Sequence, residues 1–144
     1  MNVRELIELH EGRVPHAYQD SLGFWTIGVG HLIDQRKGGK LPEAIIDALL
    51  DLDIQEHANE LFAVLPWVRD FDPVRQAALV DMYFNLRRNL LDFKDTLRHL
   101  QAGAWEAAAR EMLDSRWASQ VGQRAIRIAE MVRTGEWPKV GAGS

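Results

Sequence analysis

Residues 11–32 read EGRVPHAYQDSLGFWTIGVGHL, and this stretch decides the fold that we expect. It is rich in β-branched and aromatic side chains, which favour strands. Gly23, Gly28 and Gly30 interrupt these side chains and favour turns. The pattern predicts two or three short antiparallel strands joined by tight turns.

Helical periodicity flanks this stretch on both sides. Before it, apolar spacing predicts a helix over residues 3–10 that Gly12 ends. After it, Pro42 suits the first turn of a helix, and an apolar stripe continues to Phe62, which gives a rod of about 30 Å. Shorter helices are predicted beyond this rod, at residues 72–82, 90–100, 105–113, 115–117 and 123–132.

Together these elements predict an α+β fold in a single domain, in which a small antiparallel β-hairpin lobe is inserted into a mainly helical body. The small lobe is expected over residues 13–60, and the helical lobe takes residues 1–12 and 61–144. The long helix is expected to connect the two lobes.

The composition is that of an ordinary globular protein. The 144 residues are 47% hydrophobic and 26% charged, and they include no cysteine, which excludes thiol nucleophiles and cysteine-ligated metal sites. No apolar run approaches the roughly 18 residues of a membrane span. The net charge is −4, and the first 60 residues carry eleven acidic and five basic side chains. Nucleic-acid binding, which needs a basic surface, is therefore not expected.

Common metal and cofactor motifs are absent from the sequence. The five histidines do not show the HExxH spacing of a zinc site. Gly28 and Gly30 begin a GxG pattern, but Ile33 occupies the third glycine position of a dinucleotide-binding loop. No GxSxG nucleophile motif occurs. We therefore expect neither a metal nor a cofactor.

Two carboxylates and a hydroxyl group fall close together in the sequence: Glu11 at the end of the first helix, Asp20 in the hairpin and Thr26 on the next strand. A surface charge is the ordinary role for either acid, since the chain contains 21 acidic residues. A hairpin that folds back over the helix end would gather the three groups around a cleft. Hydrolysis of a glycosidic bond needs an acid, a second carboxylate and a group that orients water.

The chain contains, in order, the blocks EG at 11–12, AYQDSLG at 17–23, WTIGVGHL at 25–32, SRW at 115–117, RA at 124–125 and RTGEW at 133–137. In these blocks it resembles the T-even phage lysozyme family, glycoside hydrolase family 24, over residues 1–137. The resemblance implies a muramidase that cuts the β-1,4 bond between N-acetylmuramic acid and N-acetylglucosamine in bacterial peptidoglycan.

The resemblance also implies roles for single residues. Glu11 matches the general acid, Asp20 the second carboxylate and Thr26 the water-positioning hydroxyl. The family is regarded as inverting, and inverting glycosidases in general hold their two carboxyl groups about 6.5–9.5 Å apart. Arg124 matches an arginine that pairs with the catalytic glutamate, which orients the acid and favours its ionised form. The alternative for Arg124 is an ordinary surface arginine.

Further positions are expected to support this site. His31 is matched with Asp53, for which a structural salt bridge is favoured over catalysis. Four residues match positions along the substrate cleft, with core or capping roles equally open: Leu32, Phe84, Asn85 and Thr96. Leu86–Leu90 departs from similar lysozymes, which often have a glycine-containing loop there, and puts the far wall of the cleft in question.

The expected biological role is that of a phage or prophage endolysin. The N-terminus is amphipathic and acidic and does not resemble a signal peptide. We therefore expect a monomer that stays in the host cytoplasm until a holin releases it to the cell wall. Two alternatives stay open: a lytic transglycosylase, which closes an anhydro ring instead of adding water, and a non-catalytic wall-binding module. The presence of Asp20 and Thr26 argues against the transglycosylase, and the presence of Glu11 and Asp20 argues against the binding module.

Overall fold

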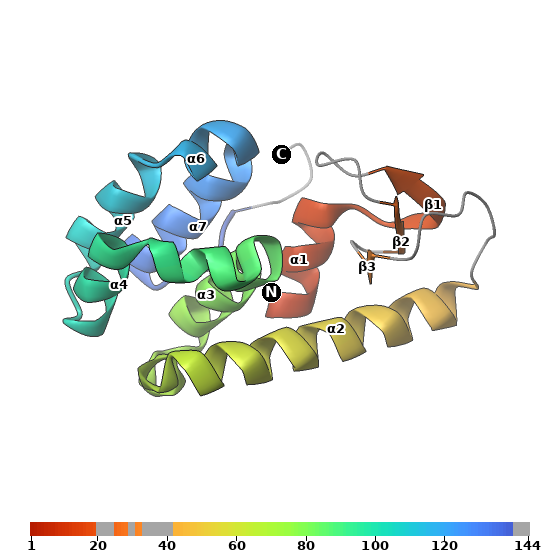
Figure 1. The fold of residues 1–144 in the computed structure, drawn as a ribbon, viewed down its shortest axis with the longest axis horizontal. Helices are drawn as coiled ribbons and strands as arrows, with labels where there is room; N and C mark the ends of the chain where they lie inside the picture. The colour runs from red at the N-terminus through yellow and green to blue at the C-terminus, as the bar shows by residue number, and fades with distance from the viewer. Residues whose placement is uncertain (20–24, 29–30, 33–41, 140–144) are drawn as a thin grey trace.

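The computed structural model describes residues 1–19, 25–28, 31–32 and 42–139, and between residues 14 and 32 it describes the backbone alone. Helices make up most of this part of the chain (Figure 1). They are α1 (Val3–Glu11), α2 (Glu43–Val64), the 3-10 helix η1 (Pro66–Asp70), α3 (Pro73–Leu86), the 3-10 helix η2 (Arg87–Asp92), α4 (Lys94–Gln101), α5 (Trp105–Leu113), α6 (Arg116–Val121) and α7 (Gln123–Thr134).

Three short antiparallel strands follow α1 in the sequence: β1 (Val14–Gln19), β2 (Trp25–Gly28) and β3 (His31–Leu32), with β2 in the middle of the sheet. Tyr18 pairs with Thr26, and Thr26 pairs with Leu32. The sheet lies at one end of the molecule, beside α1 and over the first part of α2 (Figure 1). The pairing of Val14 with Gly28 places the end of β2 close to the end of α1.

The α+β fold class predicted from the sequence is wrong. Outside residues 14–41 and 140–144, 82% of the chain is helical and none of it is strand. The buried hydrophobic residues of the described core come from the helices and their caps. The predicted short strands do form, but the longest has six residues and the shortest has two, so helices dominate the described chain. The class is all-helical, with the three-stranded sheet as an attachment.

Capping residues define where the helices begin and end. The side chain of Asn2 accepts a hydrogen bond from the backbone N–H of Glu5, 2.9 Å away, and begins α1. Gly12 ends that helix with φ of 78°, a conformation that glycine adopts without strain. Asp72 is the N-cap of α3 and Pro73 is its first helical residue, at the start of the helix predicted over residues 72–82.

The long helix predicted from Pro42 is confirmed as α2, which has 22 residues. It contacts α1 and α3 as well as β2 and β3, and in Figure 1 it runs along one side of the molecule beneath both the sheet and the helices. Among the described helices, none combines the length and apolar character that crossing a membrane requires. Through its contacts with β2, β3, α1 and α3, the helix α2 connects the sheet to the helical core.

The helix α3 forms the centre of the core. Its eight residues from Ala77 to Phe84 are all buried, which is the pattern of a helix surrounded by other elements. It packs against α1, α2 and α7. One of the eight buried residues, Asp81, is charged, and its partners lead to the candidate site.

Candidate functional site

Glu11 is the last residue of α1 and lies at the junction between that helix and the sheet. Its carboxylate oxygen Oε1 accepts a hydrogen bond from Nη1 of Arg124, 2.9 Å away. The Glu11 side chain is 21% exposed, whereas that of Arg124 is 8% exposed. The acid is therefore open to solvent on one side and held by a buried cation on the other.

Arg124 projects from α7 and is fixed by a second carboxylate. Its Nε donates to Oδ1 of Asp81 over 2.8 Å, and its Nη2 donates to the backbone carbonyl of Asp81 over 3.4 Å. Burial would lower the pKa of Arg124, but the negative charges of Asp81 and Glu11 outweigh that effect and raise it above its ordinary value. Arg124 therefore remains a cation, and its guanidinium group joins the two carboxylates.

His10 completes this chain of contacts from the residue before Glu11. Its Nδ1 donates to Oδ2 of Asp81 over 2.7 Å. The side chains of His10 and Asp81 are 1% and 0% exposed. One buried carboxylate therefore holds a histidine from α1 with one oxygen and an arginine from α7 with the other.

The structure brings together only some of the residues singled out in the sequence, within the part of the chain that it describes. The contact of Arg124 with Glu11 is the one that the resemblance implied. Asp20 lies outside the described residues. Thr26 lies in the middle strand β2, where its backbone is described and its side chain is not. The catalytic roles of Glu11, Asp20 and Thr26 therefore stay predictions.

The predicted pair of His31 and Asp53 is likewise not tested. Asp53 is a buried residue of α2, and its backbone carbonyl accepts a hydrogen bond from Nδ1 of His57 over 2.5 Å. His31 and Leu32 form β3, which contacts α2. The helix that carries Asp53 and the strand that carries His31 are therefore neighbours, but the side chain of His31 is outside the described part.

The predicted cleft residues of α3 are fixed by aromatic neighbours. Phe84 is 3% exposed, and its ring centroid lies 4.9 Å from that of His57. Oδ1 of Asn85 accepts a hydrogen bond from Nε1 of Trp117 in α6 over 2.7 Å. Phe84 is therefore a core residue, whereas Asn85 is half-buried and faces a surface pocket of about 450 Å³.

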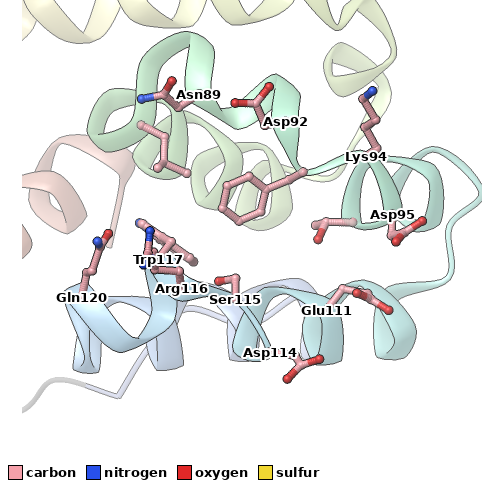
Figure 2. A pocket seen from close by; sticks show the side chains of 13 residues that line it. Asn89, Asp92, Lys94, Asp95, Glu111, Asp114, Ser115, Arg116, Trp117 and Gln120 are labelled. Carbon is pink, nitrogen blue, oxygen red and sulfur yellow. The ribbon is translucent and has the colours of Figure 1, made fainter.

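Thr96, the last predicted cleft residue, lines a different pocket of about 420 Å³. Figure 2 shows this pocket between η2 and α4 on one side, which carry Asn89, Asp92 and Asp95, and α5 and α6 on the other, which carry Glu111 and Trp117. Leu86 and Asn89 belong to the walls of both pockets. The divergent stretch Leu86–Leu90 therefore separates two hollows on the same surface.

His10 and Asp81 were not among the predicted site residues. The sequence does contain a signal for each of them. Asp81 is the one charged residue in the apolar run AALVDMYF at 77–84, and His10 falls on the apolar face of the first predicted helix. A charge inside a buried run needs a partner, because an unpaired buried charge is strongly disfavoured.

Comparison with known proteins identifies a set of similar chains. The family model described as Phage lysozyme matches residues 8–133. Two proteins of Dictyostelium discoideum, named probable T4-type lysozymes 1 and 2, are 28% and 26% identical, and each alignment covers 93% of this chain and 95% of the relative. The pre-baseplate central spike protein Gp5 of Enterobacteria phage T4 is 25% identical over 98% of this chain and 29% of its own length.

Proposed function

The chain belongs to the phage lysozyme family and is a lysozyme-like peptidoglycan hydrolase, and we propose that it is a muramidase that cleaves the β-1,4 bond between N-acetylmuramic acid and N-acetylglucosamine. The proposed reaction is hydrolysis with inversion at the anomeric carbon. It uses Glu11 as the general acid, Asp20 as the second carboxylate and Thr26 as the residue that orients water. These assignments rest on the sequence match of residues 11–32.

In the proposed mechanism, Glu11 donates its proton to the glycosidic oxygen as the bond to the anomeric carbon breaks. A water molecule positioned by Thr26 attacks that carbon from the opposite face and loses a proton to Asp20. One product carries a new reducing end, and the other carries the hydroxyl group of the leaving sugar. One proton passes from Glu11 to the leaving sugar, and a second passes from the attacking water to Asp20.

The observation that carries the proposal is the contact between Glu11 and Arg124. A general acid must be anchored and must also be reachable by the substrate. The hydrogen bond of 2.9 Å to a buried arginine provides the anchor, and the 21% exposure of the Glu11 side chain provides the access. A glutamate with only a surface role would not need a hydrogen bond from a buried arginine that lies 113 positions later in the sequence.

The surface beside α3 supports a carbohydrate substrate. We assign Leu32, Phe84, Asn85 and Thr96 to the sugar-binding site, as the sequence match suggests. Asn85 and Thr96 each line one of the two pockets, and polar side chains beside aromatic ones suit the hydroxyl groups and apolar faces of sugar rings. Phe84 and Thr96 are each 3% exposed, so they would act by supporting neighbouring side chains rather than by direct contact.

For the biological setting we propose an endolysin. In this role the chain is a monomer that accumulates in the host cytoplasm and reaches the wall through membrane lesions made by a holin. The resemblance to phage proteins supports the proposal. Expression with and without a holin, followed by lysis of the culture, tests it, and lysis without the holin would contradict it.

The test of the enzymatic proposal is digestion of purified peptidoglycan by the wild type, by Glu11→Gln and by Glu106→Gln. Glu106 is an exposed residue of α5 and provides a matched control for loss of one carboxylate. Mass spectrometry should find hydrated reducing muropeptides with the wild type and with the control, and at least about 10²-fold less with Glu11→Gln. Anhydro products would identify a lytic transglycosylase instead. Wall binding without products would identify a binding module.

A further inference from the structure

We infer that Asp81 and His10 are positioning residues for Glu11: Asp81 balances the charge of Arg124, and His10 fixes the Asp81 carboxylate. This inference rests on the proposed role of Glu11 as the general acid. It assigns a function to a buried pair that the proposed mechanism does not otherwise use.

The need for a balancing charge follows from the contact that anchors Glu11. Arg124 lies 2.9 Å from the Glu11 carboxylate, and a cation at that distance favours the ionised form of an acid. A general acid, however, must hold its proton before it donates it. A buried arginine that faced Glu11 alone would anchor the acid, but it would also favour the loss of the proton that the acid must donate.

Asp81 removes most of this conflict. Its carboxylate engages Nε of Arg124 at 2.8 Å, from the side of the guanidinium group that points away from Glu11. Asp81 is fully buried, so little solvent screens this interaction. The negative charge of Asp81 therefore weakens the attraction of Arg124 for an ionised Glu11. Asp81 also repels negative charge on Glu11 directly. Both effects favour a proton on Glu11.

His10 fixes the orientation of the Asp81 carboxylate. Nδ1 of His10 binds Oδ2 of Asp81, which leaves Oδ1 directed at Arg124. The other ring nitrogen, Nε2, is buried and has no hydrogen-bond partner within the described residues. The described contacts of the ring therefore serve Asp81. Because His10 directly precedes Glu11 in α1, the same bond also ties the acid's own helix turn to α3.

The charged groups around this chain come from three helices. Within the described residues they are His10 and Glu11 from α1, Asp81 from α3 and Arg124 from α7. Helix α2 and the 3-10 helices η1 and η2 also pack against α3, and α2 brings the His57 ring against Phe84. Among the described acids, Asp81 should therefore have the largest effect on the protonation of Glu11.

The experiment replaces Asp81 by asparagine, which keeps the shape and one acceptor oxygen but removes the charge. Asp70→Asn is the matched control, since Asp70 is exposed at the end of η1. Two readouts are recorded for each folded variant: the ¹³C NMR titration of the Glu11 carboxyl carbon, and the pH dependence of peptidoglycan hydrolysis. Circular dichroism establishes that each variant is folded.

We expect the titration midpoint of Glu11 to fall by about one pH unit or more in Asp81→Asn, the size expected when a cation loses its counter-charge. The alkaline limb of the activity profile should move down by the same amount, because activity is lost where Glu11 loses its proton. Asp70→Asn should match the wild type in both readouts. An unchanged Glu11 midpoint in folded Asp81→Asn would overturn the inference. Wild-type protein that never hydrolyses peptidoglycan would overturn the proposed function, while the NMR titration would still decide the inference.

A second pair of variants tests His10 and covers the case in which Asp81→Asn does not fold. His10→Leu removes the donor to Asp81, and His10→Gln keeps one. We expect kcat to fall about five-fold in His10→Leu, the equivalent of one hydrogen bond of about 1 kcal/mol, with KM unchanged. His10→Gln should recover most of the loss. A rise in KM in place of a fall in kcat, or equal kcat in all three proteins, would show that His10 does not position the acid.

Discussion

Nη1 of Arg87 donates a hydrogen bond to Nε2 of His57, which ties the end of α3 to the middle of α2. Nδ1 of the same ring donates to the carbonyl of Asp53. Since a guanidinium group only donates, Nε2 of His57 is the acceptor in this contact. Arg87 makes this contact from a backbone with φ of 54° and ψ of −135°, a conformation that favours glycine.

The backbone of Arg87 leads to a prediction about alanine and glycine at neighbouring positions. Arg87→Gly should be more stable than Arg87→Ala by about 1–2 kcal/mol, because the glycine adopts a positive φ without steric conflict. Both variants lose the hydrogen bond to His57, so the difference in their free energies of unfolding reports the backbone effect alone. Urea unfolding at equilibrium measures this difference.

The next residue provides the control for this comparison. Arg88 is exposed in the same 3-10 helix and is not among the described residues with positive φ. There the order should reverse: the free energy of unfolding of Arg88→Ala should exceed that of Arg88→Gly by about 0.5–1 kcal/mol. The same preference for alanine at both positions would refute the strained conformation of Arg87.

The second prediction concerns acid stability and the ion pairs between α1 and α2. Nη2 of Arg13 lies 2.8 Å from Oδ1 of Asp47, which also binds Arg4. The hydrogen bond from Arg13 holds the pKa of Asp47 below its ordinary value of 3.8. A carboxyl group whose folded-state pKa is lowered stabilises the protein above the unfolded value and loses that contribution as the pH falls through the folded value.

Asp47→Asn should therefore lower Tm at about pH 6 and have little effect near about pH 2, where the carboxyl group is protonated in both states. Thermal unfolding followed by circular dichroism at both pH values measures the difference. Asp70→Asn, at an exposed position outside the cluster, should leave Tm near that of the wild type at either pH. An equal deficit for Asp47→Asn at both pH values would mean that the ion pairs do not stabilise the fold.

The third prediction tests Asn85 as a sugar contact. Trp117 holds Oδ1 of Asn85 through its indole N–H, so Trp117→Phe should free the amide to rotate. We expect KM for peptidoglycan to rise about five-fold, the equivalent of a hydrogen bond of about 1 kcal/mol, with little change in kcat. Trp105→Phe is the control, because Trp105 packs against Phe71 and Arg75 instead. Equal KM values for the two variants would remove Asn85 from the substrate site.

Much of the helical framework follows from the sequence because its signals are local. Apolar spacing after Pro42 predicted α2, and apolar spacing over residues 72–82 predicted α3. The fold class could not be derived in the same way. Strand formers in residues 14–33 indicate that strands form, but they do not show that helices dominate the described part of the fold.

The candidate site shows the same division between local and distant information. Arg124 was found through resemblance to a family and not through its neighbours in the chain. His10 and Asp81 are 71 positions apart, and neither stands in a recognisable motif. Their pairing depends on how α1 packs across α3, which the spacing of apolar residues within each helix does not determine.

The order in which the ribosome makes these helices adds a constraint on when the site is complete. Glu11 and His10 belong to the first helix, Asp81 to the central one and Arg124 to the last. A growing chain therefore presents both carboxylates long before their shared cation is synthesised. Because buried acids without a cation repel each other and resist desolvation, α1 should dock firmly on α3 only after α7 has been made. The acid that the proposed reaction needs is thus among the first residues translated and among the last to be set in place.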